Sequence, residues 1–424
     1  MANLTHISKS NRGNILVLLL CLNFLLVKAQ NDYARLPFLN LTANKLYMPN
    51  DSTIFTKLFL RMLTLSSTPS ANNITVVHIG GSHVQAGIWT NTFESDLRNK
   101  FTSGGGGYFV FPYKMAKTNG QPYASAFTNG NWKRCRAISQ DTCSPLGMNG
   151  IRVSTNDTNC VFGLALKPKA GIQKANLVHV YHNFNPSFSF KINNAAIQSR
   201  TDFIEAGYTA FELTEANDSI SFTLTRHDTL QRDFHLFGFS LLNTGAPGFF
   251  VAGLGANGAS SSSFLKCNLF VPQLKTIQPD LVILSLGVND TQSKGFEKED
   301  YIEHYDTLIN RIKEANPNVC IVLTTTTDNY VRHKVSSKRS VKTSNKSTIQ
   351  AQEAMFDLMK KHNVAVWDLF EVMGGYKSMA KWQKVGMAAR DKVHFTAGGY
   401  VVVGHLMYEA FLKSILSQPN RQNH

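Results

Sequence analysis

The sequence ITVVHIGGSHVQ, residues 74–85, decides the fold class of this chain. Its first six residues form a largely apolar run of the length expected for a buried strand. Gly80 and Gly81 follow directly and predict a tight turn without side-chain obstruction. Ser82 then stands just before the helix that apolar spacing predicts over 84–101. A serine at such a strand–turn–helix junction is a candidate nucleophile, although serine is also a favoured helix N-cap.

A second motif, DKVHF at residues 391–395, lies near the other end of the chain. A carboxylate three positions before a histidine can hold the imidazole by one ring nitrogen and leave the other free to take a proton from a hydroxyl. We therefore expect Ser82, His394 and Asp391 to meet. The alternatives are that His394 packs in the core beside Phe395 and that Asp391 caps the last helix.

Two glycine-containing turns between these motifs are candidates for binding a developing oxyanion. LVILSLGVND, residues 281–290, reads as a second buried strand followed by Asn289, at the end where an α/β sheet places its ligand groups. GANGAS, residues 255–260, is a turn whose backbone N–H groups can point at the same place. The alternative for Asn289 is that it only closes a turn with Gly287.

Together these blocks resemble the SGNH (GDSL-type) hydrolase family, over roughly 74–100 and 240–416. They are most similar to the branch that removes or transfers O-acetyl groups on peptidoglycan, whose members carry a serine followed by His-x-Gln and a G-x-N-G-A turn. Both patterns are present, as SHVQ at 82–85 and GANGA at 255–259. One position departs from the family, because Gly81 replaces an aspartate that buttresses the loop and is not the triad acid.

The resemblance implies a role for each of these residues. Ser82 is expected to be the nucleophile, His394 the general base and Asp391 the acid that orients it. The backbone N–H groups of Ser82 and Gly258 and the side chain of Asn289 are expected to bind the oxyanion. Possible substrate-binding residues, for which packing, exposure or a structural role is the alternative, are His83, Gln85 and Asp290.

Strands alternate with helices on both sides of a β-rich middle, which predicts an α/β fold with a three-layer parallel sheet flanked by helices. Residues 103–236 instead form short runs separated by turn residues, as in a β-sandwich. We expect 1–29 to be a signal peptide, 30–102 and 237–424 the hydrolase domain, and 103–236 an inserted module. The resemblance implies that this module is jelly-roll-like and similar to carbohydrate-binding domains. Its aromatic residues would stack on sugars or pack its core: Tyr108, Phe109, Tyr113, Trp132, Tyr181 and Phe184.

A polar and basic stretch follows the expected strand at 319–325. The sequence TTTTDNY at 324–330 leads into five basic or imidazole side chains within 332–339. This composition predicts a mobile loop at the edge of the sheet where Asn289 lies. Such a loop is either simply solvated or a rim that attracts an anionic polymer.

The N-terminus has the features of a secretory signal: Lys9 and Arg12 precede an apolar segment at 15–27, and cleavage is expected near Ala29. The segment is too short and too polar at its end for a stable membrane span, although an uncleaved anchor is the alternative. Cleavage would lower the net charge from +15 to +12, because it removes three basic residues and no acid. A secreted or periplasmic basic protein favours anionic surfaces as partners. No nucleic-acid-binding motif is present, so nucleic acid is not expected.

Cysteine and histidine spacing gives little support for a metal site, and no cofactor is expected. Five cysteines would remain after cleavage, and export permits disulfides. Cys135 and Cys143 would close a short loop. The odd number leaves at least one thiol free, and Cys267 and Cys320 lie in apolar surroundings typical of small buried side chains.

These observations predict a secreted serine esterase that removes O-acetyl groups from a glycan, with peptidoglycan the first choice. Transfer of acetyl to a sugar hydroxyl uses the same three residues, so an O-acetyltransferase and an acetyl-xylan-type esterase remain alternatives. A non-catalytic glycan-binding protein is a further alternative, favoured by Gly81. The intact Ser82, Asn289, Asp391 and His394 count against it.

Overall fold

The structure is a computed structural model that describes residues 33, 35–68, 72–102, 104–139, 143–167, 174–230, 233–336 and 340–417. The expected signal peptide, 1–29, lies outside these residues, so its cleavage and an exported location stay predictions. None of the helices in the described ranges is long and apolar enough to cross a membrane.

A parallel sheet forms the centre of the molecule, with neighbouring strands in the order β19-β16-β15-β2-β14. The β2 strand is buried along its whole length, as its apolar sequence predicts. Its last residue, Gly80, pairs with Gly255 on one side and Ser285 on the other, so the turns that follow all three strands meet at one edge. A short antiparallel strand, β1, closes the far edge. The strands are β1 (Leu46–Tyr47), β2 (Ile74–Gly80), β14 (Phe249–Gly255), β15 (Leu281–Ser285), β16 (Cys320–Thr324) and β19 (Ala365–Trp367).

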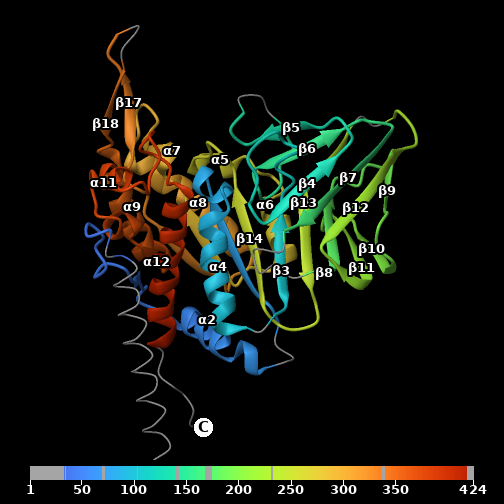
Figure 1. The fold of residues 1–424 in the computed structure, drawn as a ribbon, viewed down its shortest axis with the longest axis horizontal. Helices are drawn as coiled ribbons and strands as arrows, with labels where there is room; N and C mark the ends of the chain where they lie inside the picture. The colour runs from blue at the N-terminus through green and yellow to red at the C-terminus, as the bar shows by residue number, and fades with distance from the viewer. Residues whose placement is uncertain are drawn as a thin grey trace, which may run out of the picture.

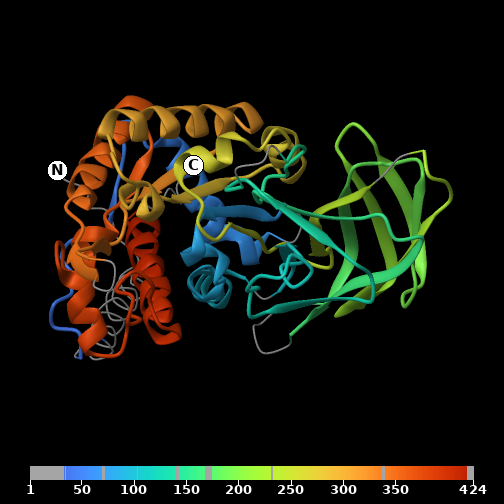
Figure 2. The same cartoon turned by 90° about the horizontal axis from the view of Figure 1, so that it is seen from above.

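Helices cover both faces of this sheet (Figures 1 and 2), which confirms the predicted three-layer α/β fold. One layer contains α2 (Thr53–Thr64), α4 (Ile88–Phe101) and α12 (Ala397–Leu416), which pack on one another. The other contains α5 (Ser261–Leu265), α6 (Phe270–Ile277), α8 (Lys298–Ala315) and α9 (Ser347–His362). Short helices follow several strand ends: η1 (Leu65–Ser67), α3 (Ser82–Gln85), α7 (Val288–Thr291), α10 (Leu369–Val372) and α11 (Ser378–Lys384).

The β-rich middle of the chain extends the same sheet and adds a second one. Beyond β14 the large sheet continues through β3 (Gly106–Val110), β13 (Phe234–Asn243), β8 (Ala175–His182), β11 (Tyr208–Asn217) and β10 (Ile197–Phe203). β6 (Ile151–Thr155) also pairs with β13, and β5 (Lys133–Arg136) pairs with β6. A four-stranded sheet packs against it, made of β4 (Ala124–Thr128), β7 (Asn159–Leu166), β12 (Ser219–Arg226) and β9 (Phe188–Ile192). A cluster of phenylalanines fills the space between them: Phe162, Phe190, Phe222, Phe234 and Phe239.

The division of the chain into 30–102, 103–236 and 237–424 stays a prediction. The structure places β3, from the expected insert, parallel to β14 and antiparallel to β13. One sheet therefore runs from the helix-flanked part into the β-sandwich without a break.

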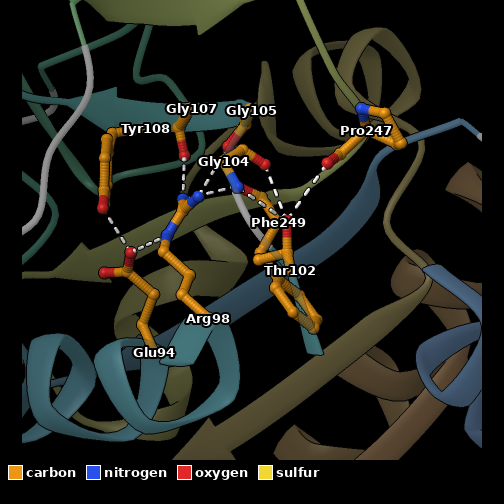
Figure 3. A network of polar contacts seen from close by, with 9 residues as sticks. All are labelled: Glu94, Arg98, Thr102, Gly104, Gly105, Gly107, Tyr108, Pro247 and Phe249. Carbon is orange, nitrogen blue, oxygen red and sulfur yellow. Dashed lines mark hydrogen bonds and ion pairs between the residues drawn. The ribbon is translucent and has the colours of Figure 1, made fainter. Parts of the chain in front are cut away.

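A buried polar network connects α4 to the strands where the helix-flanked part of the sheet meets the β-rich part (Figure 3). The Glu94 and Arg98 side chains form an ion pair on α4, and the Tyr108 hydroxyl of β3 donates to the same Glu94 oxygen. The remaining guanidinium N–H groups of Arg98 donate to the carbonyls of Gly105, Gly107 and Phe249. One arginine thereby joins α4 to β3 and β14.

The stretch after β16, which is expected to be a mobile loop, contains a buried segment and a strand. Residues 324–329 are buried, and Arg332, His333 and Lys334 lie in β17 (Tyr330–Lys334), which pairs with β18 (Ser340–Ser344) above α11 in Figure 1. The backbone N–H of Tyr330 donates to the Lys392 carbonyl at 3.1 Å. The prediction of a loop is therefore wrong for Tyr330–Lys334, because β17 and β18 satisfy each other's backbone groups and contact the segment that carries His394. Residues 337–339 lie outside the described residues.

Candidate active site

The turn after β2 has no room for side chains at its two glycines. A Cβ atom at Gly80 would lie 2.4 Å from Val84 and 2.8 Å from the Ser285 carbonyl. At Gly81 it would lie 3.2 Å from both the Ala259 carbonyl and the Asn289 amide nitrogen. This close approach brings the ends of β2, β14 and β15 against one another.

Ser82 is the first residue of α3, and its Oγ lies 2.8 Å from His394 Nε2. Gly81 occupies the N-cap position, and no side chain caps the helix. The capping alternative for Ser82 is therefore wrong, because its hydroxyl is directed to an imidazole and not to the helix backbone.

Asp391 completes a hydrogen-bonded chain, since its Oδ2 lies 2.7 Å from His394 Nδ1. Its Oδ1 accepts from the backbone N–H groups of Val393, at 2.9 Å, and His394, at 3.0 Å. Lys392 between them has a φ of 60°, the left-handed conformation that this tight turn requires. The carboxylate thus fixes both the turn and the ring.

The electrostatics favour an ionised Asp391. Burial raises its pKa, but the hydrogen bonds from His394 and from the Val393 and His394 backbone outweigh burial and lower the pKa below the ordinary value. The side chains of His394 and Asp391 remain 40% and 45% exposed, so an ester in solvent can reach the hydroxyl of Ser82.

The three expected oxyanion donors lie around the same turn. The backbone N–H of Ser82 is at a helix start, where no intrahelical acceptor exists. Gly258 is exposed and has a φ of 83°. Asn289 donates one amide hydrogen to the Ala259 carbonyl at 2.8 Å, which leaves the other amide hydrogen for a ligand.

Gln85 and Asp290, expected as possible substrate ligands, are instead buried supports of the turn that carries Gly258. Gln85 donates to the Asn119 carbonyl at 2.7 Å and accepts from the Asn257 backbone N–H at 2.6 Å. Asp290 accepts from the backbone N–H of Ser261, at 2.9 and 3.1 Å, and from its hydroxyl. The structure corrects the substrate-binding expectation for both residues, because their polar groups are turned inward.

His83, the third possible ligand, packs beneath His394. The two rings stack with centroids 5.3 Å apart, and His83 Nδ1 lies 3.1 Å from the hydroxyl of Tyr400 on α12. Burial, with the nearby His394, lowers the pKa of His83 to about 3, so its ring is neutral at physiological pH. Tyr400, six positions beyond His394, belongs to no motif that would single it out from the sequence.

A disulfide joins Cys135 to Cys143, the pairing considered from the sequence. The segment it closes contains Ile138, whose Cδ1 would lie 3.3 Å from a Cβ atom at Gly258. Cys160, Cys267 and Cys320 are free and buried. In the described part of the chain, no group of three or more His, Cys, Asp or Glu side chains is placed to hold a metal ion.

Comparison with known proteins concerns the family and the fold of the chain. Residues 218–402 match the model of the GDSL-like lipase/acylhydrolase family, which confirms the resemblance to SGNH hydrolases and supports an esterase or acylhydrolase class. This range contains Gly258, Asn289, Asp391 and His394 but not Ser82. No curated protein matches the sequence at a significant level.

The fold is shared with a solved structure that matches most of the chain. A peptidoglycan O-acetylesterase has a TM-score of 0.69 at 20% identity, and the match covers 88% of this chain and 99% of that one. A carbohydrate esterase of family 3 from Talaromyces cellulolyticus is 17% identical over 41% of this chain and 75% of its own, with a TM-score of 0.30. A GDSL-like lipase from Bacteroides thetaiotaomicron is 15% identical over 39% and 76%, with a TM-score of 0.28.

Proposed function

We propose that this protein is a serine esterase that removes O-acetyl groups from a glycan, most of all peptidoglycan, through an acyl-enzyme on Ser82. The observation that carries the proposal is the hydrogen-bonded chain from Ser82 through His394 to Asp391. It stands beside three donors suited to an oxyanion: the backbone N–H groups of Ser82 and Gly258 and the Asn289 amide.

In the first step, His394 Nε2 takes the proton of Ser82 while Oγ forms a bond to the acetyl carbonyl carbon. The carbonyl π electrons move onto oxygen, where each well-placed donor lowers the barrier by roughly 3 kcal/mol. The tetrahedral intermediate then breaks its bond to the sugar oxygen, which receives the proton from His394. Asp391 stabilises the imidazolium throughout. Water repeats the sequence to release acetate and restore Ser82.

Two observations support a peptidoglycan substrate. A solved structure that matches 88% of the chain is that of a peptidoglycan O-acetylesterase. The chain also carries 43 basic against 28 acidic residues, a surplus that suits an anionic wall polymer. Secretion through the N-terminal segment would bring the enzyme to that polymer.

Acetate release tests the proposal. The purified protein is incubated with O-acetylated peptidoglycan and with acetylated xylan, each with and without an acceptor oligosaccharide. We expect faster acetate release from peptidoglycan than from xylan, with no acetylated acceptor formed. Acetyl appearing on the acceptor would make the protein a transferase, and preference for xylan would contradict the proposed substrate. No release from either would refute the esterase.

A further inference from the structure

Two adjoining hollows on the β-rich part of the molecule form a basic groove. They have volumes of about 320 and 280 Å³ and share Lys114 in their walls. Lys117 and Lys133 also line the first, and Lys167 lines the second. We call the surface formed by these four residues the lysine groove.

The ammonium groups of the lysine groove are uncompensated. All four lysines are exposed, and none makes a side-chain hydrogen bond or ion pair with the residues that the structure describes. Other lysines are paired, such as Lys298 with Asp357 and Lys361 with Asp306, whereas exposed Lys57, Lys100 and Lys360 also make no ion pair with the described residues. Asp233 is the one acidic side chain among the described residues that line the two hollows. The groove therefore favours an anionic ligand.

The walls of the groove lead to the candidate active site. Thr118, in the second hollow, accepts hydrogen bonds from the side chains of Asn257, at 3.3 Å, and Gln85, at 3.1 Å. β5, which carries Lys133, continues into Ile138 beside Gly258. Figure 1 shows β4, β5 and β6 at the same end of the molecule as α5 and α7. A polymer with its ester at Ser82 can thus extend along the groove.

The lysine groove does not recognise sugars by stacking on aromatic side chains. Five of the aromatic residues considered for stacking are buried core residues: Tyr108, Phe109, Tyr113, Trp132 and Tyr181. Trp132 lines the first hollow, but its indole N–H donates to Thr128 within the protein, and its ring packs against Phe162. Charge and side-chain hydrogen bonds remain as the means of recognition.

We infer that the lysine groove binds carboxylate groups of the peptides attached to a glycan strand, and so selects an anionic acetylated polymer over a neutral one. This inference rests on the proposed function, because the groove is assigned to the polymer whose ester meets Ser82. Ammonium groups attract carboxylates electrostatically, and several such contacts along a strand add up. A small neutral ester has no group to place there.

Binding of a product-like ligand tests the groove separately from catalysis. The probe is a de-O-acetylated peptidoglycan fragment with free stem-peptide carboxylates, titrated calorimetrically against the full chain. The triple variant Lys114→Gln/Lys117→Gln/Lys133→Gln should bind it roughly tenfold more weakly, since each exposed charge contact contributes a few-fold. The same fragment with amidated carboxylates should bind wild type and variant equally weakly.

A matched variant controls for overall charge. Lys57→Gln/Lys100→Gln/Lys360→Gln removes three exposed lysines from α2, α4 and α9 and should leave the dissociation constant unchanged. Both triple variants should hydrolyse an aryl acetate at the wild-type rate, which shows that they are folded. The inference would be overturned if the groove variant bound the fragment as tightly as wild type. It would also be overturned if the control variant weakened binding as much as the groove variant does. Failure to release acetate with the groove effect intact would refute only the proposed esterase.

Discussion

Asp391 holds three N–H groups at once: the ring Nδ1–H of His394 and the backbone N–H groups of Val393 and His394. Only a carboxylate can accept all three, because each of its oxygens offers two lone pairs and no hydrogen. The hydrogen bonds keep its pKa below the ordinary value of about 3.9, so it stays ionised above about pH 4. If activity falls on acidification while the pH is still above about 4, the protonation of a group other than Asp391 must cause the loss.

Asp391→Asn tests this role, because it replaces one carboxylate oxygen by an amide NH2 group. The amide would favour the wrong tautomer of His394, so turnover of an aryl acetate should fall by roughly 10⁴-fold. Asp300→Asn, an exposed position on α8, should leave turnover unchanged. A loss of less than about tenfold at Asp391 would mean that another acid orients the ring.

The residue types of the candidate site could be predicted, but not the direction of every side chain. Ser82, Asn289, Asp391 and His394 follow strand ends or stand before a helix, and strand ends are recognisable from sequence. Gln85 lies three residues after Ser82, yet it faces the interior, where it holds Asn257. No local pattern distinguishes an inward from an outward side chain in a helix of four residues.

At the scale of elements, the Glu94–Arg98–Tyr108 network joins α4 to two strands of the large sheet (Figure 3). Burial raises the pKa of Glu94, although the ion pair with Arg98 and the Tyr108 hydrogen bond oppose this. Removing Arg98 would therefore leave an uncompensated carboxylate in a dry place.

Arg98→Met should lower the free energy of unfolding by about 3–5 kcal/mol, measured by urea denaturation. Without the arginine, Glu94 favours its neutral form, so the loss should be smaller at pH 5 than at pH 8. The exposed pair of Arg200 and Asp202 is the control, and Arg200→Met should cost at most about 1 kcal/mol. An Arg98→Met loss below that, or one independent of pH, would remove the network from the stability of the junction.

Two strands, β3 and β17, could not be predicted from local sequence patterns. Residues 106–110 begin within a glycine run and carry no sign of their partners, yet they form β3 between β14 and β13 in the large sheet. The basic stretch at 332–339 predicts a loop, but its first three residues lie in β17, which pairs with β18. In both cases the decisive fact is the pairing partner, which is distant in sequence for β3. A charged surface strand has no apolar alternation to reveal it.

At the scale of the whole molecule, the continuous sheet changes what the β-rich part can be. Replacing 103–236 by a short linker would remove β3 from the edge of β14 and β8 from β13. The buried faces of β13 and β14 would then be exposed. The β-rich part is thus joined to the architecture of the core, and its contribution to substrate binding is better tested by surface substitutions.

The most direct test of the central claim is whether a covalent acetyl-enzyme forms in wild type and fails to form in Ser82→Ala. We expect the variant to lose aryl acetate hydrolysis and to form no covalent acetyl-enzyme detectable by intact mass, while wild type forms one on Ser82. Its melting temperature should barely change, because Ser82 makes no capping hydrogen bond and even a cap is worth about 1 kcal/mol. Turnover within tenfold of wild type, or acetyl on another residue of the wild-type protein, would contradict the account.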